Sequence, residues 1–141
     1  MREIVVDAST AIKTVVPEDM SNKADALISE AKASGIELIA PHLYEPETIS
    51  VLSRKVWERK LTKTQADMAL KALKDIPVKL SSFSDQADRA WMIARQFNMR
   101  YAYDAFYVAL AEYRNCELWT ADKKLYDTVH NTFPFVKWLG N

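Results

Sequence analysis

Glycine, cysteine and histidine are scarce in this chain of 141 residues, which contains two glycines, one cysteine and two histidines. Two isolated glycines cannot form a glycine-rich phosphate-binding loop, so nucleotide-cofactor enzymes with such loops are excluded. One cysteine cannot form an internal disulfide, and with two histidines it falls short of the four ligands of a structural zinc site. We therefore expect the protein in a reducing compartment, the cytoplasm.

Long apolar runs are also missing. None approaches the roughly 20 residues of a membrane span, and the N-terminal run is too short for a signal peptide. We expect a soluble protein without membrane contact. The hydrophobic fraction, 49%, is sufficient for one compact core, and no linker rich in Pro, Gly or Ser interrupts the chain. A single domain over residues 1–141 is the resulting prediction.

Charge is balanced in total but unevenly distributed. Residues 1–52 carry nine acidic and four basic side chains, whereas residues 53–79 carry three acidic and eight basic ones. A net charge of zero argues against a large non-specific nucleic-acid surface. The basic segment could contact an RNA backbone, although a solvated helical face is the simpler interpretation.

Hydrophobic periodicity predicts strands that alternate with helices. Short apolar runs typical of buried strands lie at 3–6, 37–40, 78–83, 116–120 and 135–139. Helical spacing lies between them, from about residue 9 and over 21–34, 43–57, 62–73, 84–97, 103–114 and 122–129. Ser21 and Thr62 are predicted N-caps, and Gly35 is a predicted helix stop. The alternation favours an α/β fold with three α/β/α layers and a central parallel sheet.

Aromatic residues make up 11% of the chain. In a domain of this size they are expected to form core and interfaces, and none is assigned to RNA stacking. In the helix expected over 84–97, spacing predicts a buried face that contains Ala87, Ala90, Trp91 and Ala94.

Three acids stand at informative places. Asp7 ends the first strand and Asp122 follows the strand that ends at Thr120, so both are expected at the carboxyl edge where parallel sheets collect ligands. Each could instead be only a helix N-cap, because a short carboxylate satisfies free backbone N–H groups. Asp104 lies in an apolar segment and is expected beside buried surface, where an acid needs a partner or a metal. Its alternative is a first-turn position that suits the helix dipole.

Glu47 is the weakest candidate when taken alone. Helical spacing places Glu45, not Glu47, on the stripe of Ile49 and Val56. The hydrophobic pattern by itself therefore does not select Glu47.

Taken together, these acids lie in segments that resemble the PIN-domain family of metal-dependent ribonucleases, and most closely the VapC toxins. The segments are VVDAS at 5–9 followed by Lys13, PHLYEPETISVLSR at 41–54, YDAFYVALAE at 103–112 and LWTADKKL at 118–125. The resemblance implies a PIN-like domain with a catalytic, metal-binding cluster. Its members would be Asp7, Glu47, Asp104 and Asp122, with the hydroxyls of Ser9 and Thr120 beside them.

Carboxylates without His or Cys suit hard divalent cations, so Mg²⁺ or Mn²⁺ is the expected cofactor and zinc is disfavoured. Lys13 and Arg54 are expected either to contact phosphate or to pair with the acids. The resemblance further implies a homodimer, an RNA substrate and a cognate antitoxin that covers the site.

These observations favour a metal-dependent endoribonuclease that is the toxin of a toxin–antitoxin pair. One alternative is an RNA-processing nuclease of the same fold without a toxin role, which expression alone would distinguish by leaving growth unaffected. Another is a non-catalytic binding module whose acids only cap helices or dock a partner. Titration with Mn²⁺ separates that module from a nuclease, because dispersed caps would not bind the ion.

Overall fold

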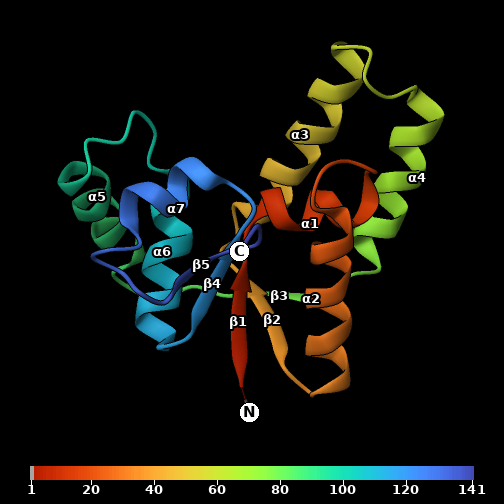
Figure 1. The fold of residues 1–141 in the computed structure, drawn as a ribbon. Coiled ribbons are helices and arrows are strands. Elements are labelled where there is room, and N and C mark those ends of the chain that lie inside the picture. The colour runs from red at the N-terminus through yellow and green to blue at the C-terminus, as the bar shows by residue number, and fades with distance from the viewer. Residues whose placement is uncertain (1) are drawn as a thin grey trace.

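A computed structural model describes residues 2–141 and shows a five-stranded parallel sheet among them (Figure 1). The strands are β1 (Glu3–Val6), β2 (Glu37–Ala40), β3 (Val78–Leu80), β4 (Glu117–Thr120) and β5 (Val136–Trp138). Their order is β3-β2-β1-β4-β5, and every neighbouring pair is parallel. The chain therefore builds outward from β1 on one side and then on the other. Such a reversal opens a crevice at the carboxyl ends of the strands.

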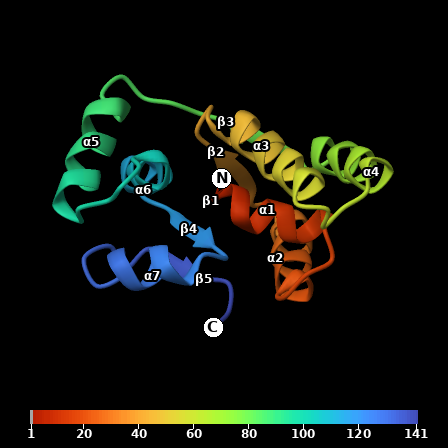
Figure 2. The same ribbon diagram turned by 90° about the horizontal axis from the view of Figure 1, so that it is seen from above.

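Seven helices join the strands within the described part of the chain. They are α1 (Ala8–Val15), α2 (Ser21–Ala33), α3 (Tyr44–Trp57), α4 (Lys63–Lys74), α5 (Gln86–Gln96), α6 (Tyr103–Arg114) and α7 (Lys123–Val129). Viewed from above, α1 to α4 lie on one side of the sheet and α5 to α7 on the other, which confirms the predicted three-layer α/β/α fold (Figure 2). Of the helices in residues 2–141, none has the length and apolar character required to cross a membrane.

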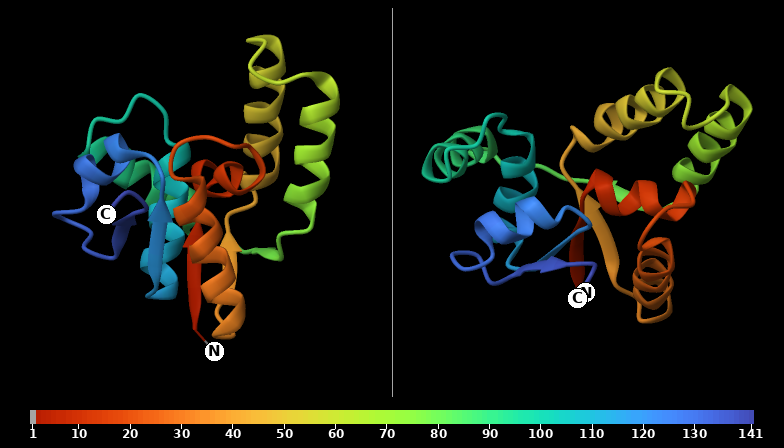
Figure 3. Two further views of the ribbon diagram at one scale, coloured as in Figure 1. Left: turned by 45° about the vertical axis from the view of Figure 1, so that its right-hand side comes forward. Right: turned by 45° about the horizontal axis from the view of Figure 1, so that its top comes forward.

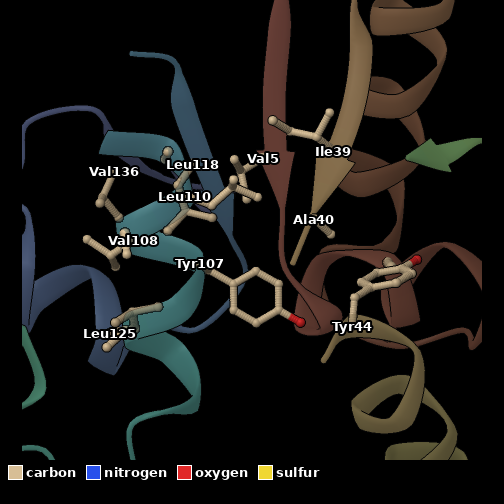
Figure 4. Close-up of a cluster of buried hydrophobic side chains, with 14 of the residues drawn as sticks. Val5, Ile39, Ala40, Tyr44, Tyr107, Val108, Leu110, Leu118, Leu125 and Val136 are labelled. Atoms are coloured by element: carbon tan, nitrogen blue, oxygen red, sulfur yellow. The ribbon is translucent and has the colours of Figure 1, made fainter. Parts of the chain in front are cut away.

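The central strand β1 shows why helices cover both faces. Ile4 and Val6 belong to a hydrophobic cluster that includes Ala31 of α2. Val5, between them, belongs to the larger core around Tyr107 of α6 (Figure 4). Because neighbouring side chains point to opposite faces, a strand buried on both faces is apolar at every position. That requirement produced the continuous apolar run from which β1 was predicted.

Helices α3 and α4 form a hairpin that extends beyond the carboxyl ends of the strands (Figures 1 and 3). A capping box starts α4. The Thr62 hydroxyl accepts from the Gln65 backbone N–H at 3.1 Å, and the Gln65 side chain accepts from the Thr62 backbone N–H at 2.9 Å. The predicted cap at Thr62 is confirmed. The capping box satisfies two backbone N–H groups that have no carbonyl partner within the helix.

The predicted cap at Ser21 is wrong. Ser21 is the first residue of α2, and Met20 precedes it in the left-handed region, at φ +69°, without a side-chain cap. The Ser21 hydroxyl instead donates to the Val16 carbonyl at 3.2 Å and accepts from the Glu18 backbone N–H at 3.0 Å. It therefore closes the loop before α2. The predicted stop is confirmed, since Gly35 follows the last turn of α2 with φ +68°.

The predicted buried face of α5 is also wrong in part. Ala87 and Trp91 are exposed, and the buried residues are Gln86, Ala90, Ile93 and Ala94. Trp91 lies under the guanidinium of Arg95, 5.0 Å from the ring centroid. Trp91 and Ile93 are two positions apart and therefore lie on different faces of the helix. The alanines fit a face that contains either residue, so the pattern selected the face of Trp91 although the face of Ile93 is buried.

The cap on α4 provides a test of local stability. Thr62→Ala removes the hydroxyl that accepts from Gln65, and we expect the free energy of unfolding to fall by about 1 kcal/mol. Thr64→Ala, an exposed position within the same helix, is the matched control and should leave stability unchanged or slightly raised. Urea denaturation followed by circular dichroism measures both. Equal losses in the two variants would contradict the capping role.

Candidate active site

A pocket of about 450 Å³ lies at the carboxyl end of β1, where the order of the strands reverses. All four acids selected from the sequence line it, and they come from four separate segments of the chain. Asp7 follows β1, Glu47 and Asp104 lie in the first turns of α3 and α6, and Asp122 caps α7. The fold thus brings all four candidates to one place.

Asp7 is the most buried of the four, with 3% of its surface exposed. Its carboxylate accepts from the Ser9 hydroxyl at 2.7 Å and from the Thr10 backbone N–H at 3.0 Å. Burial raises the pKa of Asp7, while hydrogen bonding from Thr120, Ser9 and Thr10 lowers it. Asp7 therefore caps α1 and lines the pocket at once, so the two interpretations of this residue are compatible.

The hydroxyls of Ser9 and Thr120 connect the ends of β1 and β4. Ser9 Oγ accepts from the Ala121 backbone N–H at 3.1 Å, and Thr120 Oγ1 accepts from the Asp122 backbone N–H at 3.0 Å. The two hydroxyl oxygens lie 3.5 Å apart. Both hydroxyls are therefore used to hold the segments that carry Asp7 and Asp122.

The choice between Glu45 and Glu47 is decided by which depression each lines. Glu47 lines the acidic pocket, and Glu45 lines a separate depression between α3, α4 and β3. The Tyr107 hydroxyl donates to Glu47 Oε1 at 2.7 Å. Burial and the charge of Asp7 raise the pKa of Glu47, and the bond from Tyr107 lowers it. The apolar stripe of Ile49 and Val56 favoured Glu45. That choice was wrong because Ile49 is 51% exposed and does not lie on the core face of α3.

Asp104 is where the acids act on one another. Burial, followed by the negative charges of Asp7, Asp122 and Glu47, raises the pKa of Asp104 to about 7. Coulomb repulsion weakens with distance. Because the charges of all three other acids contribute to the raised pKa of Asp104, the four carboxylates lie close to one another.

Asp122 has a second task besides lining the pocket. One of its carboxylate oxygens, Oδ1, accepts from the backbone N–H groups of Lys124 at 2.9 Å and Leu125 at 3.2 Å. The N-cap interpretation of this residue is therefore right in geometry. The cap holds Oδ1 in place, and within residues 2–141 the other carboxylate oxygen accepts no such backbone bond and is available to a cation.

The basic residues Lys13 and Arg54 also line the pocket, but neither forms an ion pair with the four acids within residues 2–141. Lys13 lies 3.4 Å from Glu18, which also pairs with Lys55 at 3.2 Å. Arg54 is 3.9 Å from Glu58, and 61% of its side chain is exposed. Of the two alternatives, pairing with the four acids is not seen in the described residues, and contact with phosphate stays a prediction.

No group of three or more His, Cys, Asp and Glu side chains in the described residues is gathered as a ready-made metal cage. Mg²⁺ requires less than that, because it keeps several waters and binds through one or two carboxylates. The carboxylate and hydroxyl oxygens in the lining, and the negative charges that act on Asp104, fit such a cation. The pocket therefore suits a hydrated divalent ion better than a fully enclosed one.

Two tyrosines at the site were missed by the sequence analysis. Tyr107 is fully buried and contacts Glu47, and its position one turn after Asp104 on an apolar helix was the available signal. The hydroxyl of Tyr44 is buried without a hydrogen-bond partner in the part of the chain described. Burial and the charge of Asp7 raise the pKa of Tyr44 to about 12. Burial and the charge of Glu47 also raise the pKa of Tyr107. Both phenols therefore stay protonated at neutral pH and can donate a hydrogen bond to a carboxylate.

Comparison with known proteins adds independent observations. A family model described as the PIN domain matches residues 4–131. Ribonuclease VapC9 of Mycobacterium tuberculosis is 35% identical over 125 residues, which are 89% of this chain and 90% of that protein.

Solved structures show the same fold. The Pyrobaculum aerophilum protein PAE2754 superimposes with a TM-score of 0.69 at 20% identity, covering 99% of this chain and 92% of that one. A chain of a toxin–antitoxin complex from Klebsiella pneumoniae gives a TM-score of 0.64 at 16% identity, with 95% of both chains covered.

The raised pKa of Asp104 predicts how stability depends on pH. Between its ordinary value of 3.8 and about 7 the folded state binds this proton more tightly than the unfolded chain, so stability falls as pH rises. Asp104→Asn cannot ionise. Its advantage over the unmodified chain should therefore widen by about 1 to 2 kcal/mol between pH 5 and pH 8, a figure reduced for partial exposure.

Urea denaturation in EDTA at the two pH values measures this difference. Asp67→Asn, at an exposed position on α4, is the matched control, and its difference from the unmodified chain should not change with pH. A difference for Asp104→Asn that is equally flat would show that neither burial nor the neighbouring charges raise the pKa of Asp104.

Proposed function

This chain belongs to the PIN-domain family, as its resemblance predicted, and on that premise we propose that it is a divalent-metal-dependent endoribonuclease. The observation that carries the proposal is the convergence of four carboxylates from separate segments in one pocket at the reversal of the sheet. The name of its mycobacterial relative, a ribonuclease, supports RNA as the substrate.

In this proposal Asp7, Glu47, Asp104 and Asp122 supply the carboxylates for a hydrated Mg²⁺ or Mn²⁺, of which one or two would bind the ion directly. When bound, such an ion lowers the pKa of the attacking water and offsets charge on the leaving oxygen. Asp104 exchanges its proton near neutral pH, so cation binding and proton binding compete at this carboxylate. Ionisation of Asp104 above pH 7 therefore favours the loaded site.

The other residues orient these acids. Tyr107 fixes the Glu47 carboxylate by its 2.7 Å hydrogen bond, and Ser9 fixes that of Asp7 by a bond of the same length. Buried donors of this kind need no reorganisation when charge develops. Arg54, exposed at the rim, is the more accessible of the two proposed phosphate contacts, because Lys13 is tied to Glu18.

We assign the ribonuclease to a toxin–antitoxin pair, with an antitoxin as its protein partner. The VapC name of the mycobacterial relative and the structural likeness to a chain of a toxin–antitoxin complex support this role. A toxin that cleaves RNA would act in the cytoplasm. The homodimer and the single-domain organisation stay predictions.

Cleavage of a labelled single-stranded RNA tests the activity. With Mn²⁺ we expect cleavage by the purified chain, and with EDTA none. Asp104→Asn should reduce cleavage to an undetectable level with the fold intact, because it removes a carboxylate from the cluster. Gel electrophoresis of the products and circular dichroism of the variant provide the two measurements.

Asp67→Asn is the control for loss of one surface acid and should cleave as the unmodified chain does. Calorimetric titration with Mn²⁺ completes the design, because binding that disappears in Asp104→Asn locates the ion at this site. Retained cleavage in Asp104→Asn would refute the assignment, and absence of both cleavage and Mn²⁺ binding would favour the non-catalytic module.

Expression in a bacterial host tests the toxin role. We expect induction of the unmodified chain to stop growth and induction of Asp104→Asn at equal protein level to leave growth unchanged, because arrest depends on cleavage. Growth curves and immunoblots measure both. Normal growth with a chain that cleaves RNA in vitro would point to an RNA-processing nuclease instead.

A further inference from the structure

A second depression, of about 390 Å³, adjoins the acidic pocket. Asp104 and Asp122 line both hollows and form the boundary between them. The other walls come from the loop that connects α5 to α6 and from α7, including Arg100, Tyr101 and Lys124. Whatever occupies this depression therefore lies next to the acids.

Two unpaired cations line the depression. Arg100 and Lys124 are both exposed, and neither forms a salt bridge in residues 2–141. On the opposite flank of the acids, Lys13 and Lys55 share Glu18 and keep only about 15% of their side chains exposed. The positive charge that is available to a phosphate beside Asp104 and Asp122 therefore includes Arg100 and Lys124, which the sequence analysis did not select.

Exposed aromatic rings lie beside these cations. Tyr101 is 62% exposed and Tyr103 is 59% exposed, with ring centroids 6.1 Å apart and planes inclined by 24°. The Arg100 guanidinium lies 5.2 Å from the Tyr101 ring centroid. Tyr103 borders a small hollow that it shares with Glu47. These two rings are therefore outside the core, and they line the two hollows that share acids with the acidic pocket.

The loop is held in place without these side chains. The Met99 backbone N–H donates to the Ala94 carbonyl at 2.8 Å, and Arg95 donates to the Met99 carbonyl at 2.8 Å. Asn98 turns the chain with φ +51°. Substitution of Arg100 or Tyr101 thus removes a surface function without removing the bonds that shape the loop.

Resting on the proposed nuclease function, we propose that this depression binds the nucleotide next to the cleaved phosphodiester bond of a single-stranded RNA. The base stacks on Tyr101, and the adjoining phosphate is bound by Arg100 and Lys124. Stacking on an aromatic ring with a neighbouring cation is the usual recognition of single strands, and it accepts any base. The two cations also offset the repulsion between phosphate and the acids.

Direct binding tests the site apart from cleavage. A short fluorescein-labelled RNA of mixed sequence is titrated with Asp104→Asn protein in Mg²⁺, and anisotropy reports the affinity. Adding Tyr101→Ala to this background should weaken binding about 10-fold, the size expected for one stacked base. Tyr101→Phe keeps the ring and should bind within about twofold of the parent. Tyr113→Ala is the matched control, since Tyr113 is also 62% exposed and lies in the last turn of α6.

The cations have their own measurement. Replacing Arg100 and Lys124 by Gln should reduce the slope of log affinity against log salt by about 1.4, or about 0.7 for each lost phosphate contact. Lys71→Gln, on the exposed face of α4, should leave the slope unchanged. In the cleaving chain, Tyr101→Ala should raise KM by the same factor as Kd and change kcat by less than about twofold.

The outcomes distinguish failure of the proposed nucleotide site from failure of the proposed nuclease activity. Parental affinity in Tyr101→Ala, or no RNA binding by the Asp104→Asn parent, would overturn the nucleotide site, even if the unmodified chain cleaves RNA. If the unmodified chain fails to cleave but its RNA affinity depends on Tyr101 and not on Tyr113, the site stands and the proposed reaction is wrong.

Discussion

Repulsion among four buried or half-buried carboxylates is the constraint on which the site depends. It is strongest at Asp104, where burial and three neighbouring charges raise the pKa to about 7. Hydrogen bonds counter it at the other positions, from Ser9 to Asp7 and from Tyr107 to Glu47. A pocket that stabilised only the fold would not collect like charges, so the arrangement lowers stability in a way that the proposed cation would reverse.

The basic residues around the acids are distributed in two ways. On one flank Glu18 pairs with both Lys13 and Lys55 and connects the loop after α1 to α3, so these largely buried lysines serve the structure. On the other flank Arg100 and Lys124 are exposed beside two solvent-facing tyrosines. The proposed path of an RNA therefore runs from the acids toward the α5–α6 loop, where charge and aromatic surface are both available. This asymmetry explains how a chain of zero net charge can attract a polyanion locally.

The hydrophobic pattern predicted the fold well because burial on both sheet faces requires continuous apolar strands, as in β1. It failed where contacts between helices and strands decide which face of a helix is buried. On α5 it chose Trp91 over Ile93, since alanines tolerate either face. On α3 it favoured Glu45, since Ile49 is apolar but exposed. Periodicity reports which side of a helix is apolar, and only packing decides which side is covered.

By itself the sequence determined the α/β alternation, the parallel sheet and the positions of Asp7 and Asp122 at strand ends, because these follow from local periodicity and from where apolar runs stop. The apolar segment around Asp104 singled out that residue, and the family resemblance selected Glu47. Only the tertiary structure decided that the four acids share one pocket, that Tyr107 binds Glu47, and that Arg100 lines a depression with Asp104. Those contacts join segments far apart in the chain, and their distances depend on how the helices pack across the sheet, which no local pattern encodes.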